Sequence, residues 1–325
     1  MDKSNRAEMS NENKNKQMQP PPYLLTIHQN LTVYRPVDGT SRTMFIRILA
    51  RKYVIASTHG WLVIVDQYYR SCHLWKPGSK DRIKLPRLQD FHYYRKCVLS
   101  KPPTEPDCYI LFISDDLLWQ AFCKIGDVEF ACPTQEKEVD RLIAIASFQG
   151  KIYGVMSPDY KFVTIEFVGR TMEFRPILIN GEEPLKAPAI KRNWIVRHEN
   201  DLIHSHSGNE LLLVIKNFTQ GSIKDGSEIR VFRVDINRME CIEVDDLGDQ
   251  VILIGQYGPG FCCSSRGTTF KPNSIYYIME FDSCVYVYHL DDKSTTSWLP
   301  HDLRLNDISH FWVDLNLEKL CCKSR

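Results

Sequence analysis

The histidines at positions 204 and 206 are the first side chains whose spacing could support chemistry. Only Ser205 separates them, so on a β-strand both imidazoles would project from the same face. Two imidazoles on one face can bind a metal ion, but a stable site needs more ligands, and no third ligand follows at a fixed spacing. The pattern therefore favours two polar residues at the rim of a strand, and we predict no metal site.

The 11 cysteines show no metal-binding pattern either. Cys262–Cys263 and Cys321–Cys322 are adjacent pairs, and neighbours on a strand point to opposite faces, so neither pair could readily share one tetrahedral ion. No Cys-x-x-Cys spacing occurs in the sequence. We interpret the first pair as packed side chains and the second as part of a frayed C-terminal segment.

Three pairs of adjacent aspartates could supply the carboxylates of a hydrolase. Each pair follows a run of residues typical of a strand, where Asp usually accepts hydrogen bonds from backbone N–H groups of a turn. The sequence contains no zinc-protease, serine-hydrolase, phosphate-loop or calcium-loop motif. We therefore predict a non-enzymatic protein without a cofactor, and keep an enzyme or small-ligand binder acting at a central channel as the alternative. The three pairs are Asp115–Asp116, Asp245–Asp246 and Asp291–Asp292.

Gly255, Gly258 and Gly260 form the stretch most similar to a phosphate-binding loop. Such a loop needs a helix N-terminus behind it, because the free N–H groups of the first helical turn bind the phosphate. Here the strand-like run 261–265 follows, and Pro259 has no N–H to donate. We interpret the stretch as a tight turn between two neighbouring sheets.

The charge balance excludes some partners. The 325 residues include 41 Lys and Arg against 40 Asp and Glu, so the net charge is +1. This balance supplies no long-range attraction to nucleic acid or to an anionic membrane, and we expect neither as a partner. Residues 1–22 contain no apolar stretch of the kind found in secretory signal peptides, so we expect reduced cysteines and a location in the cytoplasm or nucleus.

The elements that must position these residues are short strands. From Tyr23 onward, runs rich in β-branched and aromatic residues recur, each ended by Gly, Pro, Asp or Asn, and they are too short for helices. The runs are 53–57, 61–66, 72–77 and 82–86; 96–100, 108–114, 118–125 and 128–133; 141–147, 151–157, 162–168 and 172–179; 201–207, 210–216, 229–235 and 239–245; and 250–255, 260–265, 274–280, 284–290 and 295–300.

The spacing of these runs indicates the fold class. Four strands in units of about 40–45 residues are typical of an all-β propeller built from four-stranded blades. A large sandwich or barrel is the alternative, because it also produces evenly spaced short strands. The length from Tyr23 to Pro300 predicts about six blades, with five and seven also possible.

The ends of the chain are expected to differ from this pattern. Residues 1–22 are polar and predict a disordered tail, 23–318 the propeller, and 319–325 a frayed end. The strand-like stretch 24–34 is expected to pair with the last blade and close the ring, which hides two sheet edges. Residues 136–142 and 303–320 are the segments where a helical turn or two is expected.

Aromatic residues near loops are candidates for contact with a partner. Exposed aromatic side chains are enriched in protein interfaces, although most aromatics of a propeller fill the wedge between blades. Trp61, inside a strand run, is expected in the core. The candidate partner-facing aromatics are Tyr68, Tyr69, Tyr93 and Tyr94.

An ordered series of short segments resembles a known family. Residues 55–62 read Ile-Ala-Ser-Thr-His-Gly-Trp-Leu, similar to a Ser-Ser-His-Gly-Trp-Leu segment of the plant KIB-type β-propeller domain, the former domain of unknown function 295. His73-Leu74-Trp75-Lys76-Pro77 stands where that family usually shows Leu-Leu-Asn-Pro, and further similar segments follow at 83–86, 150–153, 208–214, 231–235, 247–249 and 273–277. The matching positions include His59, Gly60, Trp61, Leu62, Pro77, Leu85, Pro86, Gly150, Tyr153, Asn273 and Tyr276.

The resemblance implies a propeller that recognises a protein. In plant F-box and kelch-like relatives, this domain is the substrate-recognition half of a ubiquitin-ligase receptor, and an F-box of short helices before it binds a Skp-type adaptor. Residues 1–22 hold three Met and one Ala but no aliphatic or aromatic residue besides. We therefore expect an unknown protein partner, and no Skp-type adaptor bound through residues 1–22.

Overall fold

The structure is a computed structural model and is all-β apart from the short 3-10 helix η2 (Arg47–Leu49). The predicted fold class is confirmed. In the described part of the chain, no helix has the length and apolar character needed to cross a membrane. The structure describes residues 23–27, 31–44, 46–49, 52–66, 71–88, 94–114, 117–133, 141–180, 195–205, 210–219, 227–255, 258–279, 284–298 and 309–313.

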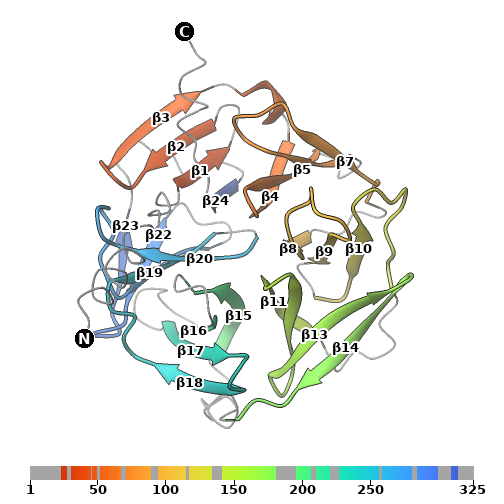
Figure 1. Cartoon of the computed structure of the whole chain (residues 1–325). Coiled ribbons are helices and arrows are strands. Elements are labelled where there is room, and N and C mark those ends of the chain that lie inside the picture. Colours follow the sequence, from red (N-terminus) through yellow and green to blue (C-terminus); the bar gives the residue numbers. More distant parts are fainter. Residues whose placement is uncertain are drawn as a thin grey trace, which may run out of the picture.

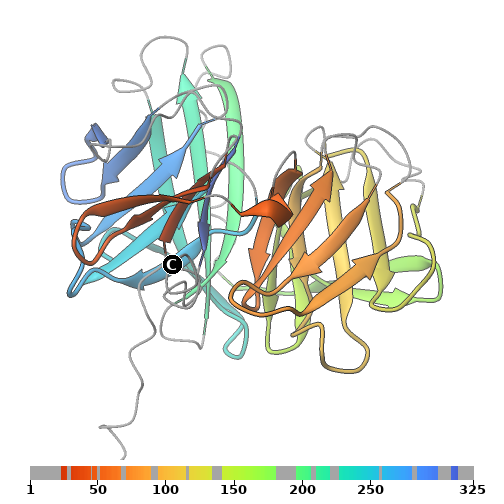
Figure 2. The same ribbon diagram turned by 90° about the horizontal axis from the view of Figure 1, so that it is seen from above.

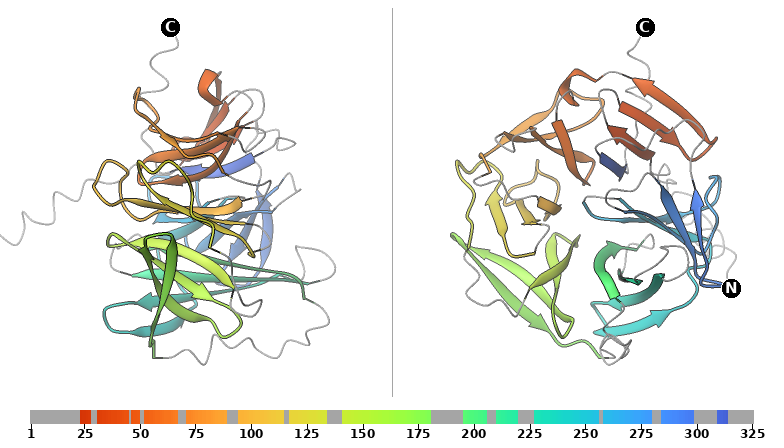
Figure 3. Two further views of the ribbon diagram at one scale, coloured as in Figure 1. Left: turned by 90° about the vertical axis from the view of Figure 1, so that its right-hand side faces the viewer. Right: turned by 180° about the vertical axis from the view of Figure 1, so that it is seen from behind.

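Six sheets surround a central axis like the blades of a propeller (Figure 1). Figure 3 shows the same closed ring from behind. Blade 1 contains β24 (Ser309–Val313), β1 (Tyr23–Ile27), β2 (Leu31–Arg35) and β3 (Thr40–Met44). Blade 2 contains β4 (Lys52–Thr58), β5 (Trp61–Asp66), β6 (Cys72–Trp75) and β7 (Arg82–Leu85). Blade 3 contains β8 (Tyr94–Leu99), β9 (Tyr109–Ser114) and β10 (Gln120–Lys124).

The second half of the chain forms the other three blades. Blade 4 contains β11 (Leu142–Phe148), β12 (Lys151–Met156), β13 (Lys161–Val168) and β14 (Thr171–Ile177). Blade 5 contains β15 (Ile195–His204), β16 (Leu211–Thr219), β17 (Ser227–Asp235) and β18 (Glu240–Val244). Blade 6 contains β19 (Gln250–Ile254), β20 (Phe261–Ser264), β21 (Ser274–Ile278), β22 (Val285–His289) and β23 (Thr295–Trp298). Figure 2 shows blades 2 and 5 on opposite sides of the molecule.

Two blades depart from the expected four antiparallel strands. Blade 3 has three strands in the described residues, and only the isolated bridge between Phe122 and Ala131 continues it outward. The run 128–133, expected as a fourth strand, therefore contributes a single pairing. Blade 6 has five strands, because β19 pairs in parallel with β21 and antiparallel with β20.

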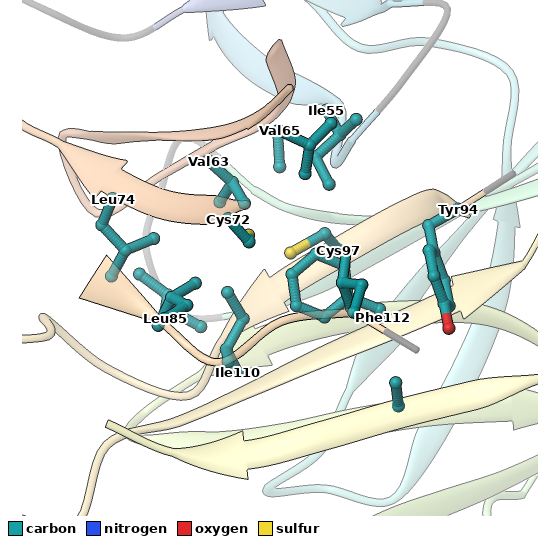
Figure 4. Close-up of a cluster of buried hydrophobic side chains, with 14 of the residues drawn as sticks. Ile55, Val63, Val65, Cys72, Leu74, Leu85, Tyr94, Cys97, Ile110 and Phe112 are labelled. Atoms are coloured by element: carbon teal, nitrogen blue, oxygen red, sulfur yellow. The ribbon is translucent and has the colours of Figure 1, made fainter. Parts of the chain in front are cut away.

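The hydrophobic core is divided among the blade interfaces. Side chains alternate between the two faces of each sheet, and each face packs against the neighbouring blade. Figure 4 shows the interface of blades 2 and 3, where Val65 and Cys72 meet Cys97 and Phe112. Each of the other five interfaces has its own cluster of buried apolar residues. Every blade is therefore held by two neighbours.

The ring closes through the C-terminal strand. β24 pairs antiparallel with β1, so that Leu24 lies opposite Trp312. The expectation that the N-terminal strand joins the last blade was wrong: β1 stays in blade 1, and β24 is supplied from the far end of the chain. Residues 309–313 are accordingly a strand, although helical turns were expected within 303–320. The periodicity of this isolated run was too short to distinguish the two.

His59 and Gly60 form a tight turn between β4 and β5. His59 has φ +50° and Gly60 φ +76°, the left-handed pair of values that a two-residue β-hairpin favours. Gln149 and Gly150 repeat this arrangement between β11 and β12, with φ +49° and +75°. In blades 2 and 4, these short turns allow the innermost strand to fold directly onto the second.

Trp61 begins β5 and is buried with 3% of its surface exposed, as expected. It packs in the interface of blades 2 and 3. Trp61→Ala should therefore lower the free energy of unfolding by about 3–5 kcal/mol, the usual cost of truncating a core aromatic.

Trp119 provides the matched control, because 41% of its surface is exposed. Trp119→Ala should cost less than about 1 kcal/mol. Chemical denaturation of both variants and the parent measures the difference. Equal losses for the two tryptophans would contradict the buried position of Trp61.

Candidate functional site: the central channel

Innermost strands from successive blades line the axis and touch one another around it. β24 contacts β4, β4 contacts β8, β8 contacts β11, β11 contacts β15, and β15 contacts β20. In this interior lie four charged side chains, Lys96, Glu199, Asp201 and Lys216. We call them the channel ion cluster.

Lys216 is the centre of the channel ion cluster. It is the last residue of the apolar run Leu211–Lys216, and only 2% of its side chain is exposed. Its Nζ lies 2.8 Å from Glu199 Oε2 and 3.0 Å from Asp201 Oδ2. Glu199 and Asp201 share one face of β15 because they are two residues apart. The strand period thus builds a carboxylate pair that holds one ammonium group.

Lys96 connects three blades. Its Nζ, on β8 of blade 3, donates a hydrogen bond of 2.9 Å to the carbonyl oxygen of Ile143 on β11 of blade 4. It also donates to the carbonyl oxygen of Asn200 on β15 of blade 5, and lies 3.6 Å from Asp201 Oδ1. A single ammonium group therefore satisfies acceptors on two neighbouring blades.

The charges of the cluster hold one another in their ionised forms. Burial raises the pKa of Asp201, but the attraction of Lys216 and Lys96 outweighs it, and the pKa lies below its ordinary value. Burial lowers the pKa of Lys216, but Asp201 and Glu199 outweigh that effect and raise it above the ordinary value. Neither group exchanges a proton near pH 7. The cluster is thus arranged for stable pairing, and not for proton transfer.

A small cavity adjoins the channel ion cluster. Its volume is about 70 Å³, and all four charged residues of the cluster line it together with Ile143 and Gly258. Next to it, the His198 imidazole hydrogen-bonds to the hydroxyl of Tyr160 and to the side chain of Asn217. Across the described residues, no group of three or more His, Cys, Asp or Glu side chains is arranged to hold a metal ion.

Gly258 and Gly260 of the glycine-rich stretch 255–260 pack against innermost strands. The stretch joins β19 to β20, and Figure 1 shows this hairpin reaching toward the middle of the ring. Gly258 has φ +81° and packs so closely on β4 that an added Cβ would lie 2.9 Å from the Ala56 Cα. An added Cβ on Gly260 would lie 2.7 Å from Ile203 of β15. The stretch connects two strands of blade 6 instead of joining two sheets as expected, and its residues Gly258 and Gly260 pack against β4 and β15.

His59 follows the innermost strand β4, and His204 ends the innermost strand β15. His59 Nε2 lies 3.2 Å from the Leu99 carbonyl oxygen and 3.1 Å from Ser147 Oγ. Burial lowers the pKa of His59, and the nearby His204 lowers it further. His204 packs its ring on Phe148, with ring centroids 5.4 Å apart. His206, its expected companion, lies outside the described residues.

The family-motif residues are spread over the blades and form no common site. Two of them stabilise a turn of blade 6: the Asn273 side chain accepts a hydrogen bond from the Leu247 N–H and donates one to Asp291, and the Tyr276 hydroxyl accepts one from the Lys271 N–H. His59, Gly60 and Gly150 lie in turns. Trp61, Leu62, Leu85, Pro86 and Tyr153 are buried, and Pro77 is partly exposed. These positions carry the fold.

One predicted partner-facing aromatic is wrongly assigned. Tyr94 is only 3% exposed and packs edge-on against Phe112 in the core of blades 2 and 3. As the first residue of β8 it lies on an innermost strand, where both faces are covered. Tyr68, Tyr69 and Tyr93 lie outside the described residues.

In the two aspartate pairs that the structure describes, Asp246 and Asp292 behave as turn residues, as expected. Asp246 Oδ1 accepts a hydrogen bond from the Gly248 N–H at 2.7 Å, and Asp292 Oδ1 accepts one from the Ser294 N–H at 3.0 Å. Asp115 and Asp116 lie outside the described residues. The carboxylates that do face the channel, Glu199 and Asp201, were missed. Their signal was a lysine at the end of the apolar run Leu211–Lys216, which requires a buried partner.

Lys216→Met should destabilise the protein by about 3–5 kcal/mol at neutral pH, because it leaves two buried carboxylates short of their countercharge. The deficit should shrink in acid. In the parent, the lowered pKa of Asp201 contributes stability that is present at neutral pH and is lost as pH falls through the folded-state value. In the variant, the carboxylates protonate at higher pH. Denaturation at pH 7 and pH 4 measures both, and a deficit independent of pH would contradict ionic pairing.

Gly258→Ala tests whether the connection between β19 and β20 packs against β4. The variant combines a strained positive φ with a contact on the Ala56 backbone. Gly267→Ala is the matched control, since Gly267 has φ +71° and nothing within 4 Å of an added Cβ. We expect Gly258→Ala to cost about 1–3 kcal/mol more than the control. Equal melting of the two variants would show that the hairpin does not pack in the channel.

The sequence profile of the KIB1-4 β-propeller family matches residues 33–303. No curated protein matches the chain. Among solved structures, a chain of Kuenenia stuttgartiensis hydrazine synthase aligns with a TM-score of 0.40 and 10% identity, covering 88% of this chain and 98% of that chain. The β-propeller domain of Cps50 (Swd1) from Myceliophteria thermophila aligns with a TM-score of 0.38 and 12% identity, covering 88% of each chain. Apo AztD from Citrobacter koseri aligns with a TM-score of 0.37 and 9% identity, covering 90% of this chain and 98% of that chain. The profile match spans most of the six-bladed ring, and the chain therefore belongs to the KIB1-4 β-propeller family.

Proposed function

We propose that this protein is a non-enzymatic, protein-binding β-propeller related to the substrate-recognition half of plant F-box ubiquitin-ligase receptors. The observation that carries the proposal is the occupied channel. The β19–β20 hairpin packs against β4 and β15, and the channel ion cluster pairs its own charges. Recognition is then left to the rims and the outer surface, where a partner as large as a protein fits.

The electrostatics of the channel support a binding protein over an enzyme. General acid–base catalysis works best with a group whose pKa lies near the operating pH. Lys216 and Asp201 are shifted the opposite way, each toward its charged form. Their pairing stabilises the ring and leaves no group poised to take a proton from a substrate in this cluster.

Exposed apolar side chains support a protein partner. Leu118 and Trp119, in the turn between β9 and β10, are 38% and 41% exposed. Leu178, between blades 4 and 5, is 88% exposed, and Val128 is 92% exposed. Large apolar and aromatic side chains at a surface are the usual anchors of protein interfaces.

We propose that any role with ubiquitin ligases does not use residues 1–22 to bind a Skp-type adaptor. An F-box buries apolar helix faces on its adaptor, and residues 1–22 contain only Met1, Met9, Met18 and Ala7 as apolar residues. They offer too little apolar area to offset the entropy lost on ordering.

Affinity purification from plant tissue, followed by mass spectrometry and cross-linking, tests the proposal. We expect a protein partner in stoichiometric amount, cross-linked to a rim or the outer surface, and reduced capture by the Leu118→Ser/Trp119→Ser variant if that turn is an anchor. A purified Skp-type adaptor should not bind. Adaptor binding that disappears when residues 1–22 are deleted would contradict the second expectation. A small molecule retained in the channel, with turnover and no protein partner, would overturn the whole proposal.

A further inference from the structure

One face of blade 2 concentrates basic side chains. Lys84 on β7 lies directly opposite His73 on β6, and Arg82 lies opposite Trp75. Lys52 lies on β4 of the same sheet, opposite Asp66 of β5. We call Lys52, His73, Arg82 and Lys84 the basic face.

The basic face continues an apolar surface that blade 1 covers. His73 pairs with Ile64, and Ile64 packs with Val54 and Trp75 in the core between blades 1 and 2. Strand alternation therefore places the basic residues on the side of the sheet that faces blade 1. Arg82 and Lys84 are exposed, whereas His73 and Lys52 are half-buried. The basic face is therefore a charged surface next to the packed interface of blades 1 and 2.

The cations of the basic face lack the partners that other cations have. Arg175, Arg230 and Arg266 each pair with a carboxylate, at 2.7, 2.6 and 2.8 Å. Within the residues that the structure describes, Lys52, Arg82 and Lys84 have no such ion pair. Asp66, which lies opposite Lys52, accepts a hydrogen bond of 3.0 Å from the Ser71 N–H.

The charged groups that act on His73 are mainly positive. Burial lowers the pKa of His73 to about 4, with Lys52 and Arg82 adding to the effect and Asp66 opposing it. Burial and Arg82 likewise lower the pKa of Lys52. The basic residues thus repel added positive charge at this face. Because the net charge of the chain is only +1, this positive field is a local feature and not a property of the whole surface.

Protection of a sheet edge explains only part of this arrangement. Charged residues on an outermost strand prevent edge-to-edge pairing, and β7 is the outermost strand of blade 2. Lys52, however, lies on β4, at the opposite side of the sheet from β7, and His73 lies on the interior strand β6, so protection of the β7 edge accounts for neither. Unpaired charge across the sheet therefore needs a second explanation.

We propose that the basic face binds an acidic segment of a partner protein. This inference rests on the proposed protein-binding function and names the chemistry of the partner. The planar fork of Arg82 suits bidentate contact with carboxylates, and Lys84 and Lys52 add point charges on the same side. Carboxylates bound at this face should raise the pKa of His73, because negative charge favours the imidazolium form.

The test uses the full chain and a short fluorescent peptide in which Glu alternates with Ser. Arg82→Gln/Lys84→Gln should weaken binding about five- to tenfold, as expected for two partly exposed charge contacts. Arg141→Gln/Lys151→Gln is the matched control, because it removes the same two residue types from blade 4, and it should bind as the parent does. Bound peptide should also raise the pKa of His73, followed by NMR of its imidazole.

Three results would overturn the inference. The first is that the parent does not bind the peptide, and the second is that both double variants lose the same affinity. The third is that a DNA oligonucleotide of matched charge binds as tightly as the peptide and loses its binding in Arg82→Gln/Lys84→Gln. That result would identify the basic face as a site for polyanions in general. The proposed function is judged separately. If the protein partner captured from tissue stays bound to Arg82→Gln/Lys84→Gln, the function stands and the basic face is not its site.

Discussion

Closure of the ring is the constraint on which the rest of this structure depends. Each blade buries its two faces only against its neighbours, so an open ring would expose the apolar faces of two blades at once. The pairing of β24 with β1 prevents this, because it joins the last described residues of the chain to the first. Several aromatic side chains pack at the same junction. Trp312 packs with Phe270 and Trp298, which also contact each other. Trp298 in turn contacts Tyr34 and Tyr276. Backbone pairing and aromatic packing thus hold blades 1 and 6 together.

A closed ring creates an interior that must be filled. Innermost strands leave backbone acceptors directed toward the axis, and buried acceptors need partners. Lys96 provides them for Ile143 and Asn200, and its charge in turn requires Asp201. The remaining space receives the hairpin tip at Gly258, where only a residue without a side chain fits against Ala56. At the axis, charge pairing and a glycine contact therefore hold the strands together, as apolar packing does between the blades.

As a consequence, the interior and the outer surface of the molecule have different roles. Its interior is used for cohesion, with the channel ion cluster held in its charged forms, and its outer surface carries exposed apolar and basic side chains. Leu118 and Trp119 are exposed at one turn, and Arg82 and Lys84 project from the edge of blade 2. Such groups are what a protein partner can contact, which is why the proposed function and the basic face belong together.

The sequence by itself determined the strands, the turns and the repeat, because these depend on residue type over a few neighbouring positions. The runs 53–57, 61–66, 72–77 and 82–86 became β4 to β7, and His59-Gly60 became the hairpin turn that its glycine required. Only the tertiary structure decided how the ring closes, that Tyr94 is buried, and that Lys96 meets Glu199, Asp201 and Lys216. Those residues come from two blades on different sides of blade 4 and have no common spacing in the chain. Their meeting follows from the angle between blades around the axis, and no local pattern of residues encodes that angle.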